Sequence, residues 1–125
     1  MGAIVVVTTV GDEQEALTIG REMVARRHAA CVNVMPGVRS VYRWKGKICR
    51  DGEYMLLIKT LADEYEAVAG VIRELHSYEL PEILSFPIAQ GDERFLAWIR
   101  ESLDKNAPAD DDEDDQDLDL DDTSF

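Results

Sequence analysis

Residues 31–60, CVNVMPGVRSVYRWKGKICRDGEYMLLIKT, decide the fold because they hold two strand-forming stretches joined by one tight turn. Both stretches are rich in Val, Ile, Tyr, Trp and Thr, which favour pleated, half-buried strands. Lys45-Gly46 stands between them as a two-residue hairpin turn. Asp51-Gly52 is a rival position for the turn, but Lys45-Gly46 pairs longer segments. The stretch therefore predicts a long β-hairpin.

The first strand of this hairpin contains an interruption at Pro36-Gly37, which predicts a bend or a β-bulge. Pairing about Lys45-Gly46 places Cys49 opposite Tyr42 and Cys31 opposite Thr60. The two thiols then lie too far apart for a disulfide or for a shared two-cysteine metal site.

The segments on either side of the hairpin repeat one pattern of elements. Before it, a β-branched run typical of a strand buried on both faces precedes apolar residues at helical spacing. After it come a second amphipathic helix, a short strand and a third helix. The predicted elements are strands at residues 3–10, 31–45, 48–60 and 83–88, and helices at residues 12–28, 63–75 and 92–103.

The order strand, helix, strand, given twice and followed by a helix, predicts an α+β fold. It indicates a ferredoxin-like βαββαβ sandwich with an extra C-terminal helix, in which two helices cover an antiparallel sheet. Asp12 with Glu15, and Asp63 with Glu66, have the spacing of capping boxes and predict where the first two helices begin.

The acidic residues gather at the C-terminal end of the chain. The 125 residues include 26 acidic and 13 basic side chains, for a net charge of −13. Residues 106–125 hold ten of the acids and no Lys or Arg. We therefore expect one domain over residues 1–105 and an acidic tail over residues 106–125, disordered because its few apolar groups cannot offset the cost of ordering.

Several classes of protein are excluded by these features. No apolar run approaches the roughly 20 residues of a membrane-spanning helix, so no membrane association is expected. The N-terminal residues lack the pattern of a signal peptide, which predicts a cytoplasmic protein with reduced cysteines. The basic hairpin could bind single-stranded nucleic acid, but the net negative charge favours a solvated strand face instead. No nucleophile elbow, phosphate-binding glycine loop or Ser-His-Asp set is present, so we expect neither catalysis nor an organic cofactor.

The predicted hairpin is too long for a domain of this size. At ~3.3 Å per residue, residues 31–45 span about 50 Å when extended. A compact domain of 100 residues has a radius of gyration of only about 13 Å. Tyr42 and Trp44 would therefore lie on exposed strands unless neighbouring subunits covered them. We expect an oligomer with Tyr42 and Trp44 at its interface.

The connector before the last strand gathers ionisable groups near the end of the hairpin. With Lys59, the residues His76, Tyr78 and Glu82 could form a small-ligand or metal pocket in which His76 is the ligand or the acid–base group. They could equally form a polar junction, with Lys59 and Glu82 as an ion pair and Tyr78 as a packed ring. By spacing alone, Cys31 is better explained as a small buried residue than as a metal ligand.

Five groups of residues along the chain carry a resemblance to a known family. They are Ala29-Ala30-Cys31-Val32-Asn33, Pro36-Gly37, Ser40-x-Tyr42-x-Trp44-x-Gly46-Lys47, Lys59-Thr60 and His76-x-Tyr78-x-x-Pro81-Glu82. Together they resemble the CutA divalent-cation tolerance family over about residues 3–103. The resemblance implies a homotrimer similar to PII signalling proteins, a role in copper and divalent-cation tolerance, and no catalytic activity.

The resemblance also implies a metal site. In some members the proposed copper ligands are a first-strand cysteine and adjacent histidines before the Tyr-x-x-Pro-Glu motif. Here Thr8 stands at the first position and Leu75 precedes the single His76. We therefore expect weak binding of copper or another divalent cation by His76, with Cys31 as a second candidate ligand. The alternative is a PII-like sensor or scaffold whose intersubunit cleft, with Lys59, Tyr78 and Glu82, binds a small ligand or a protein partner.

Overall fold

The computed structural model describes residues 2–111 of the chain. Within this part, four strands form one antiparallel sheet in the order β2-β3-β1-β4, and a short 3₁₀ turn (Ala62–Glu64) precedes the second helix. The predicted ferredoxin-like βαββαβ order with an extra C-terminal helix is confirmed. The elements are β1 (Ala3–Val10), α1 (Glu13–Ala25), β2 (Cys31–Trp44), β3 (Lys47–Leu61), α2 (Tyr65–Leu75), β4 (Leu84–Pro87) and α3 (Glu93–Ser102).

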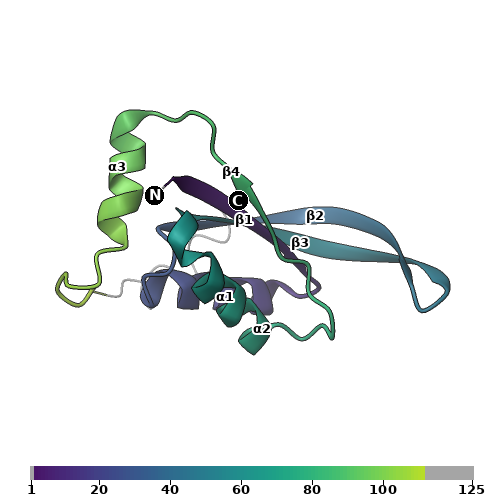
Figure 1. The fold of residues 1–125 in the computed structure, drawn as a ribbon. Coiled ribbons are helices and arrows are strands. Elements are labelled where there is room, and N and C mark those ends of the chain that lie inside the picture. Colours follow the sequence, from purple (N-terminus) through teal and green to yellow (C-terminus); the bar gives the residue numbers. More distant parts are fainter. Residues whose placement is uncertain (1, 112–125) are drawn as a thin grey trace.

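The core lies between the sheet and the two helices α1 and α2, which cover one face (Figure 1). Val6 and Ile58 are paired in register on β1 and β3, so both point to the same face, where they are completely buried. Ile19 and Met23 of α1 and Ile72 of α2 are also completely buried and cover them from the other side. Each such side chain contributes about 1.5–3 kcal/mol through the apolar surface it removes from water.

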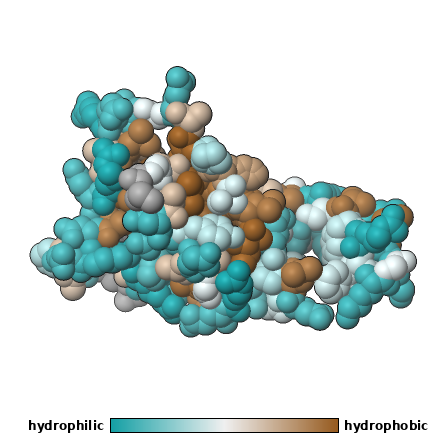
Figure 2. Space-filling view, viewed as in Figure 1, coloured by the Kyte–Doolittle hydropathy of each residue, from teal (hydrophilic) through white to brown (hydrophobic). Residues whose placement is uncertain are grey.

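The opposite face of the sheet differs from the expectation that β1 is buried on both faces. Val5 and Val7 of β1 are only half-buried. Their partners on β4, Phe86 and Leu84, are 49% and 52% exposed. Figure 2 shows apolar residues gathered around β4 and towards α3. A single chain thus leaves much of this second sheet face uncovered.

The hairpin turn lies where the sequence predicts it. Trp44 pairs with Lys47, and Lys45 and Gly46 have φ values of 52° and 79°. Positive φ at both central residues is the geometry of a type I′ turn, which matches the twist of the flanking strands. The hairpin projects beyond the helices at one end of the molecule (Figure 1).

A β-bulge at Pro36-Gly37 shifts the pairing of β2 with β3 by one residue. Tyr42 faces Cys49 as predicted, but Cys31 lies opposite Lys59 and not opposite Thr60. The expected partner of Cys31 was wrong because a bulge sets two residues of one strand against one of the other, so every pair beyond it is displaced. Gly37 has a φ of 80°, which favours glycine at this position.

One of the two predicted helix caps is present. Asp12 accepts a hydrogen bond from the backbone N–H of Glu15 at 2.9 Å and caps α1. The capping box predicted at Asp63 and Glu66 was wrong. The 3₁₀ turn incorporates Asp63, and α2 begins after Glu64 without a side-chain cap.

The end of α1 holds the C-terminal segment against the body. The helix ends at Ala25, earlier than predicted, and Arg27 adopts the left-handed conformation with φ 61°. Its guanidinium donates to the carbonyl oxygens of Asp104 at 2.6 Å, Ala107 at 3.1 Å and Pro108 at 2.5 Å. Residues 106–108, which the sequence assigned to the acidic tail, therefore contact the domain, whereas residues 112–125 lie outside the described part.

We predict that Arg27→Ala lowers the free energy of unfolding by about 1–2 kcal/mol, because three carbonyl groups lose their donor. The Arg27 side chain is only 14% exposed. Arg26→Ala is the matched control, since Arg26 pairs with Glu22 and Glu74 at the exposed surface and its loss costs less. Urea denaturation of both variants gives the comparison. Equal losses would contradict the role assigned to Arg27.

Candidate functional site

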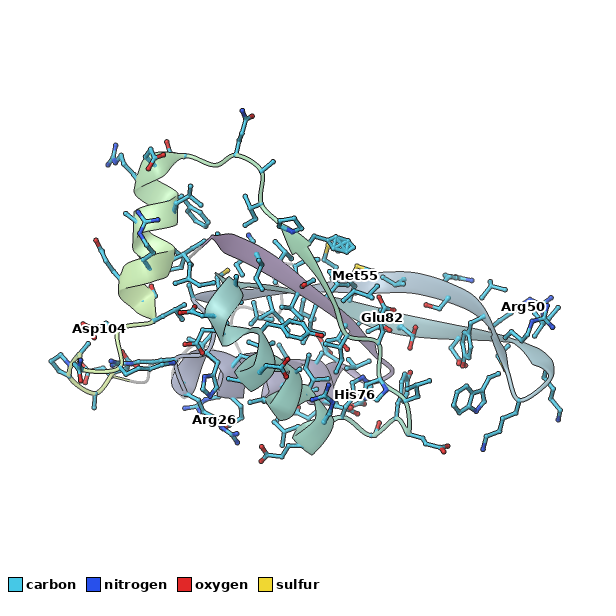
Figure 3. The ribbon with its side chains drawn as sticks, viewed as in Figure 1. Arg26, Arg50, Met55, His76, Glu82 and Asp104 are labelled. Atoms are coloured by element: carbon cyan, nitrogen blue, oxygen red, sulfur yellow. The ribbon has the colours of Figure 1, made fainter. Side chains whose placement is uncertain are left out.

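A cleft lies between the hairpin and the connector that joins α2 to β4. Its cavity volume is about 750 Å³, which is within the range of small-molecule sites. Four of the predicted site residues line it: Tyr78 and Glu82 of the expected ligand pocket, and Tyr42 and Trp44 of the expected interface. Figure 3 shows Glu82 on the connector beside the strands of the hairpin.

Glu53 of β3 also lines this cleft, and the sequence analysis missed it. Glu53 is only 7% exposed, and its Oε2 accepts a hydrogen bond from the Tyr78 hydroxyl at 2.7 Å. Among residues 2–111, no Lys, Arg or His forms an ion pair with it. The sequence held one signal for Glu53: it is an acid directly before the apolar run Tyr54-Met-Leu-Leu-Ile58, at the point where the strand becomes buried.

Two phenols of the cleft, Tyr78 and Tyr42, have raised pKa values. Burial and the neighbouring Glu53 carboxylate raise the pKa of Tyr78 above its ordinary value. Tyr42 donates a hydrogen bond to Asp51, which raises the pKa of Tyr42 to about 12. Both phenols therefore stay protonated, and able to donate hydrogen bonds, to a higher pH than an ordinary tyrosine.

His76 is placed as a structural anchor of the connector. Its side chain is completely buried, and its Nε2 lies 2.7 Å from the carbonyl oxygen of Thr9, to which it donates. Its Nδ1 accepts from the backbone N–H of Tyr78 at 3.1 Å. Nε2 therefore carries a proton, because the Thr9 carbonyl oxygen can only accept. A metal ion at His76 would have to displace one of these hydrogen bonds.

Glu15 fastens the connector from the side of α1. Its carboxylate accepts from the backbone N–H of Ser77 at 2.8 Å and from the Ser77 hydroxyl at 2.9 Å, and lies 3.4 Å from His76 Nδ1. The sequence assigned Glu15 to a capping box, but its side chain bonds the connector instead. Glu15, His76 and Tyr78 together hold one wall of the cleft.

The structure does not bring Cys31 and His76 together. Cys31 pairs with Lys59, which pairs with Val5 on β1, whereas His76 bonds Thr9 at the other end of that strand. Four residues at ~3.3 Å each separate the two positions by about 13 Å along β1. In the part of the chain that the structure describes, no group of three His, Cys, Asp or Glu side chains could hold a metal ion.

Lys59 also lies away from the cleft. Its Nζ stands 5.7 Å from the ring centre of Phe95 in α3, as in a cation–π contact. The ion pair with Glu82 that the sequence left open is not formed among the described residues.

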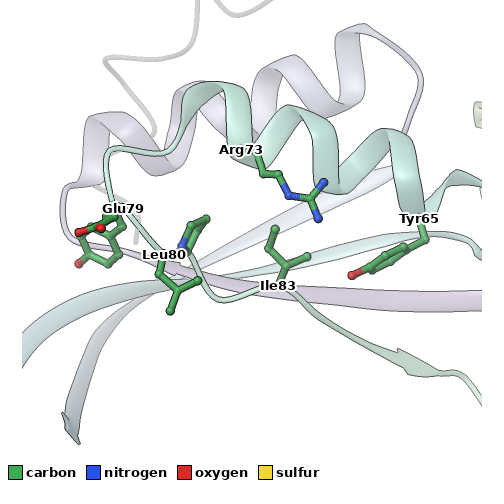
Figure 4. Close-up of a pocket in the computed structure, with 7 residues that line it drawn as sticks. Tyr65, Arg73, Glu79, Leu80 and Ile83 are labelled. Carbon is green, nitrogen blue, oxygen red and sulfur yellow. The ribbon is translucent and has the colours of Figure 1, made fainter. Parts of the chain in front are cut away.

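A second, smaller hollow lies on the other side of the connector (Figure 4). Its volume is about 450 Å³, and Tyr65 and Arg73 of α2 and Ile83 contribute to its lining. Tyr78, Leu80 and Pro81 border both this hollow and the larger cleft, so the connector is the wall between them.

The comparisons with known proteins decide the family. A family model described as "CutA1 divalent ion tolerance protein" matches residues 4–102, which is most of the chain. The chain belongs to the CutA1 family. The recognition from sequence motifs is thereby confirmed.

Individual relatives agree in sequence and in fold. The divalent-cation tolerance protein CutA of Thermus thermophilus is 43% identical over 98 residues, covering 78% of this chain and 95% of its own. Human protein CutA is 40% identical over 93 residues. The match covers 74% of this chain but only about half (52%) of the human protein. The crystal structure of CutA from Xylella fastidiosa matches with a TM-score of 0.81 and 38% identity, covering 83% of this chain and all of that one.

We predict that Tyr78 and Tyr42 ionise later than ordinary tyrosines in an alkaline titration followed by phenolate absorbance. Because the pKa of Tyr78 is raised in the folded state, the unfolded chain loses this proton first. Folding stability therefore falls as the pH rises above about 10, the ordinary pKa of tyrosine. In Tyr78→Phe the latest phenol should be absent and the alkaline loss of stability less steep. A variant that keeps that phenol would overturn the assignment.

Proposed function

We propose that this CutA1 family member acts in tolerance of divalent cations as a homotrimer in the cytoplasm, by binding a ligand at the cleft and without catalysing a reaction. The relative from Thermus thermophilus is named for divalent-cation tolerance. The observation that carries the proposal is Glu53, a buried carboxylate at the cleft without a basic partner in residues 2–111. A site of this kind favours positively charged ligands.

Direct metal binding is proposed to be weak. His76 and Cys31 remain the candidate ligands by family resemblance, and copper accepts both imidazole and thiolate. The hydrogen bonds of His76 and its distance from Cys31 both argue against a tight, preformed centre in one chain. Copper or another divalent cation would have to compete with these hydrogen bonds.

We predict that titration of the purified protein with Cu(I), Cu(II) and Zn(II) shows weak binding that His76→Ala abolishes. His28→Ala is the control, because His28 is the other histidine of the chain and pairs with Glu64 at 3.0 Å. Thermal unfolding of each variant reports whether its fold survives. Copper binding that is unchanged in a folded His76→Ala variant would remove the metal assignment.

The homotrimer is proposed from the surfaces that a single chain leaves uncovered. Phe86 and Leu84 expose about half of their area on the open sheet face, and the projecting hairpin carries Tyr42 at 41% exposure. Paired strands and apolar contacts from neighbouring copies would cover both regions. Tyr42 and the half-buried Trp44 would then lie at the interface, where aromatic side chains commonly dominate the binding energy.

We predict that Phe86→Glu dissociates the oligomer in light-scattering measurements, because it places a charge on the face that must become dry. Leu17→Glu is the control: Leu17 on α1 is 42% exposed, close to the 49% of Phe86, but it lies in the helical layer. The control should keep the mass of a trimer. A wild-type protein that is monomeric at micromolar concentration would contradict the proposed trimer.

A PII-like sensor or scaffold is the second candidate, and the cleft itself favours it. Its volume suits a small molecule better than a single ion. Calorimetric titration with nucleotides and with metal ions would separate the two functions, since a sensor of this class would bind the nucleotide.

The cytoplasmic location is a proposal with which the free thiols of Cys31 and Cys49 agree. Among the described residues, no helix is long and apolar enough to cross a membrane. Named relatives include a chloroplastic protein of Arabidopsis thaliana and a periplasmic one of Archaeoglobus fulgidus.

A further inference from the structure

We propose that residues 104–110 form a strap that closes on Arg27 and, when it opens, lengthens the acidic C-terminal end of the chain. The strap lies at the end of the molecule opposite to the hairpin (Figure 1). Its anchors are at the end of α1 and the start of α2, apart from the hairpin and the open sheet face at which neighbouring copies are proposed to meet. The inference goes beyond the proposed function and does not depend on the cleft.

The first argument is that apolar burial stops where the strap begins. Leu103, directly after α3, is only 6% exposed, whereas every residue from Asp104 to Asp111 is exposed. Hydrogen bonds and ion pairs hold these residues to the domain. A segment with little buried apolar area opens at a low cost in free energy, so the strap can open while the core stays intact.

The second argument is that one guanidinium holds most of the strap. Besides its hydrogen bonds to the carbonyl groups of Asp104, Ala107 and Pro108, Arg27 Nη2 lies 3.3 Å from the Asp110 carboxylate. These contacts reach from the first residue of the strap to the last. Loss of this one side chain would therefore release the whole segment.

Lys105 connects the strap to the start of α2. Its Nζ donates to the carbonyl oxygen of Arg27 and lies 3.2 Å from Glu64 Oε2. The other carboxylate oxygen of Glu64 lies 3.0 Å from His28 Nδ1. The Glu64 side chain is only 17% exposed, and partly buried pairs of charges are screened less than exposed ones. The closed strap thus shares one polar network with the ends of both helices.

Opening would change the reach of the acids that follow the strap. In the sequence, residues 112–125 hold eight acids and no Lys or Arg. The closed strap fixes the point from which this acidic segment starts. The open strap adds seven residues, about 23 Å when extended. The same negative charge would then reach a basic partner farther from the domain.

Limited digestion of the full-length protein with trypsin measures the open strap. Trypsin cleaves after lysine, and the bond between Lys105 and Asn106 lies inside the strap. In the closed form this bond is part of a turn, because the N–H groups of Asn106 and Ala107 both donate to Asp104. The rate of cleavage after Lys105 therefore reports the population of the open form. Cleavage after Lys59, in β3, reports opening of the whole domain.

We expect Arg27→Ala to raise the rate of cleavage after Lys105 at least about tenfold. Arg27→Lys keeps the charge but not the forked donors, and should raise the rate by a smaller factor. Arg26→Ala is the matched control, because Arg26 pairs instead with Glu22 and Glu74, and its rate should equal that of the wild type. Thermal unfolding shows that each variant is folded.

Two outcomes would overturn the inference. One is an equal rate of cleavage after Lys105 in the wild type and in both Arg27 variants. The other is a parallel rise of cleavage after Lys105 and after Lys59, because the strap would then open only together with the whole domain. The copper titration and the light scattering test the proposed function separately.

Discussion

The pairing of β1 with β3 is the constraint on which the rest of the molecule depends. All eight residues of β1 have partners on β3, so one register sets both the core and the cleft. It brings Val6 to Ile58 under the helices, and it brings Thr9 to Met55, two residues from Glu53. A slip of one residue would turn the apolar set out of the core and the acid of the cleft to the other face.

The connector after α2 completes the cleft beside these paired strands. It has no regular structure of its own between His76 and Ile83, yet side chains fasten it at its start to β1, to α1 and to β3. A segment held from three sides can keep Tyr78 and Glu82 at fixed positions without a helix or strand. Buried polar groups that are fully paired rigidify a structure in this way.

Much of the fold could be predicted from the sequence because its signals are local. The hairpin turn needs positive φ at two adjacent residues, and Lys45-Gly46 supplies a position that tolerates it. Asp12 can cap α1 because its partner is only three residues away. Asp63 failed as a cap since the short 3₁₀ turn competes for the same residues, and sequence spacing does not distinguish the two.

The candidate site was less predictable because its contacts join distant segments. The partnership of Glu53 with Tyr78 spans 25 residues, and that of His76 with Thr9 spans 67. Motif resemblance pointed to Tyr78 and Glu82, but it gave Lys59 the same weight, and Lys59 packs on α3 instead. Which charge remains unpaired is a property of the folded chain.

The β-bulge at Pro36-Gly37 divides the hairpin into an inner and an outer half with opposite phase. In the inner half of β2 the odd-numbered residues up to Met35 share a face, and in the outer half the even-numbered ones from Val38 to Trp44 continue it. Removing one residue at the bulge would exchange the two faces of the outer half and leave the inner half in place. Tyr42 and Trp44 would trade places with neighbours such as Arg43, while the core residues kept their partners. At this bulge, a single-residue insertion or deletion would therefore replace the aromatic side chains that line the cleft with basic ones. The pairing of the inner half, and with it the core, would stay unchanged.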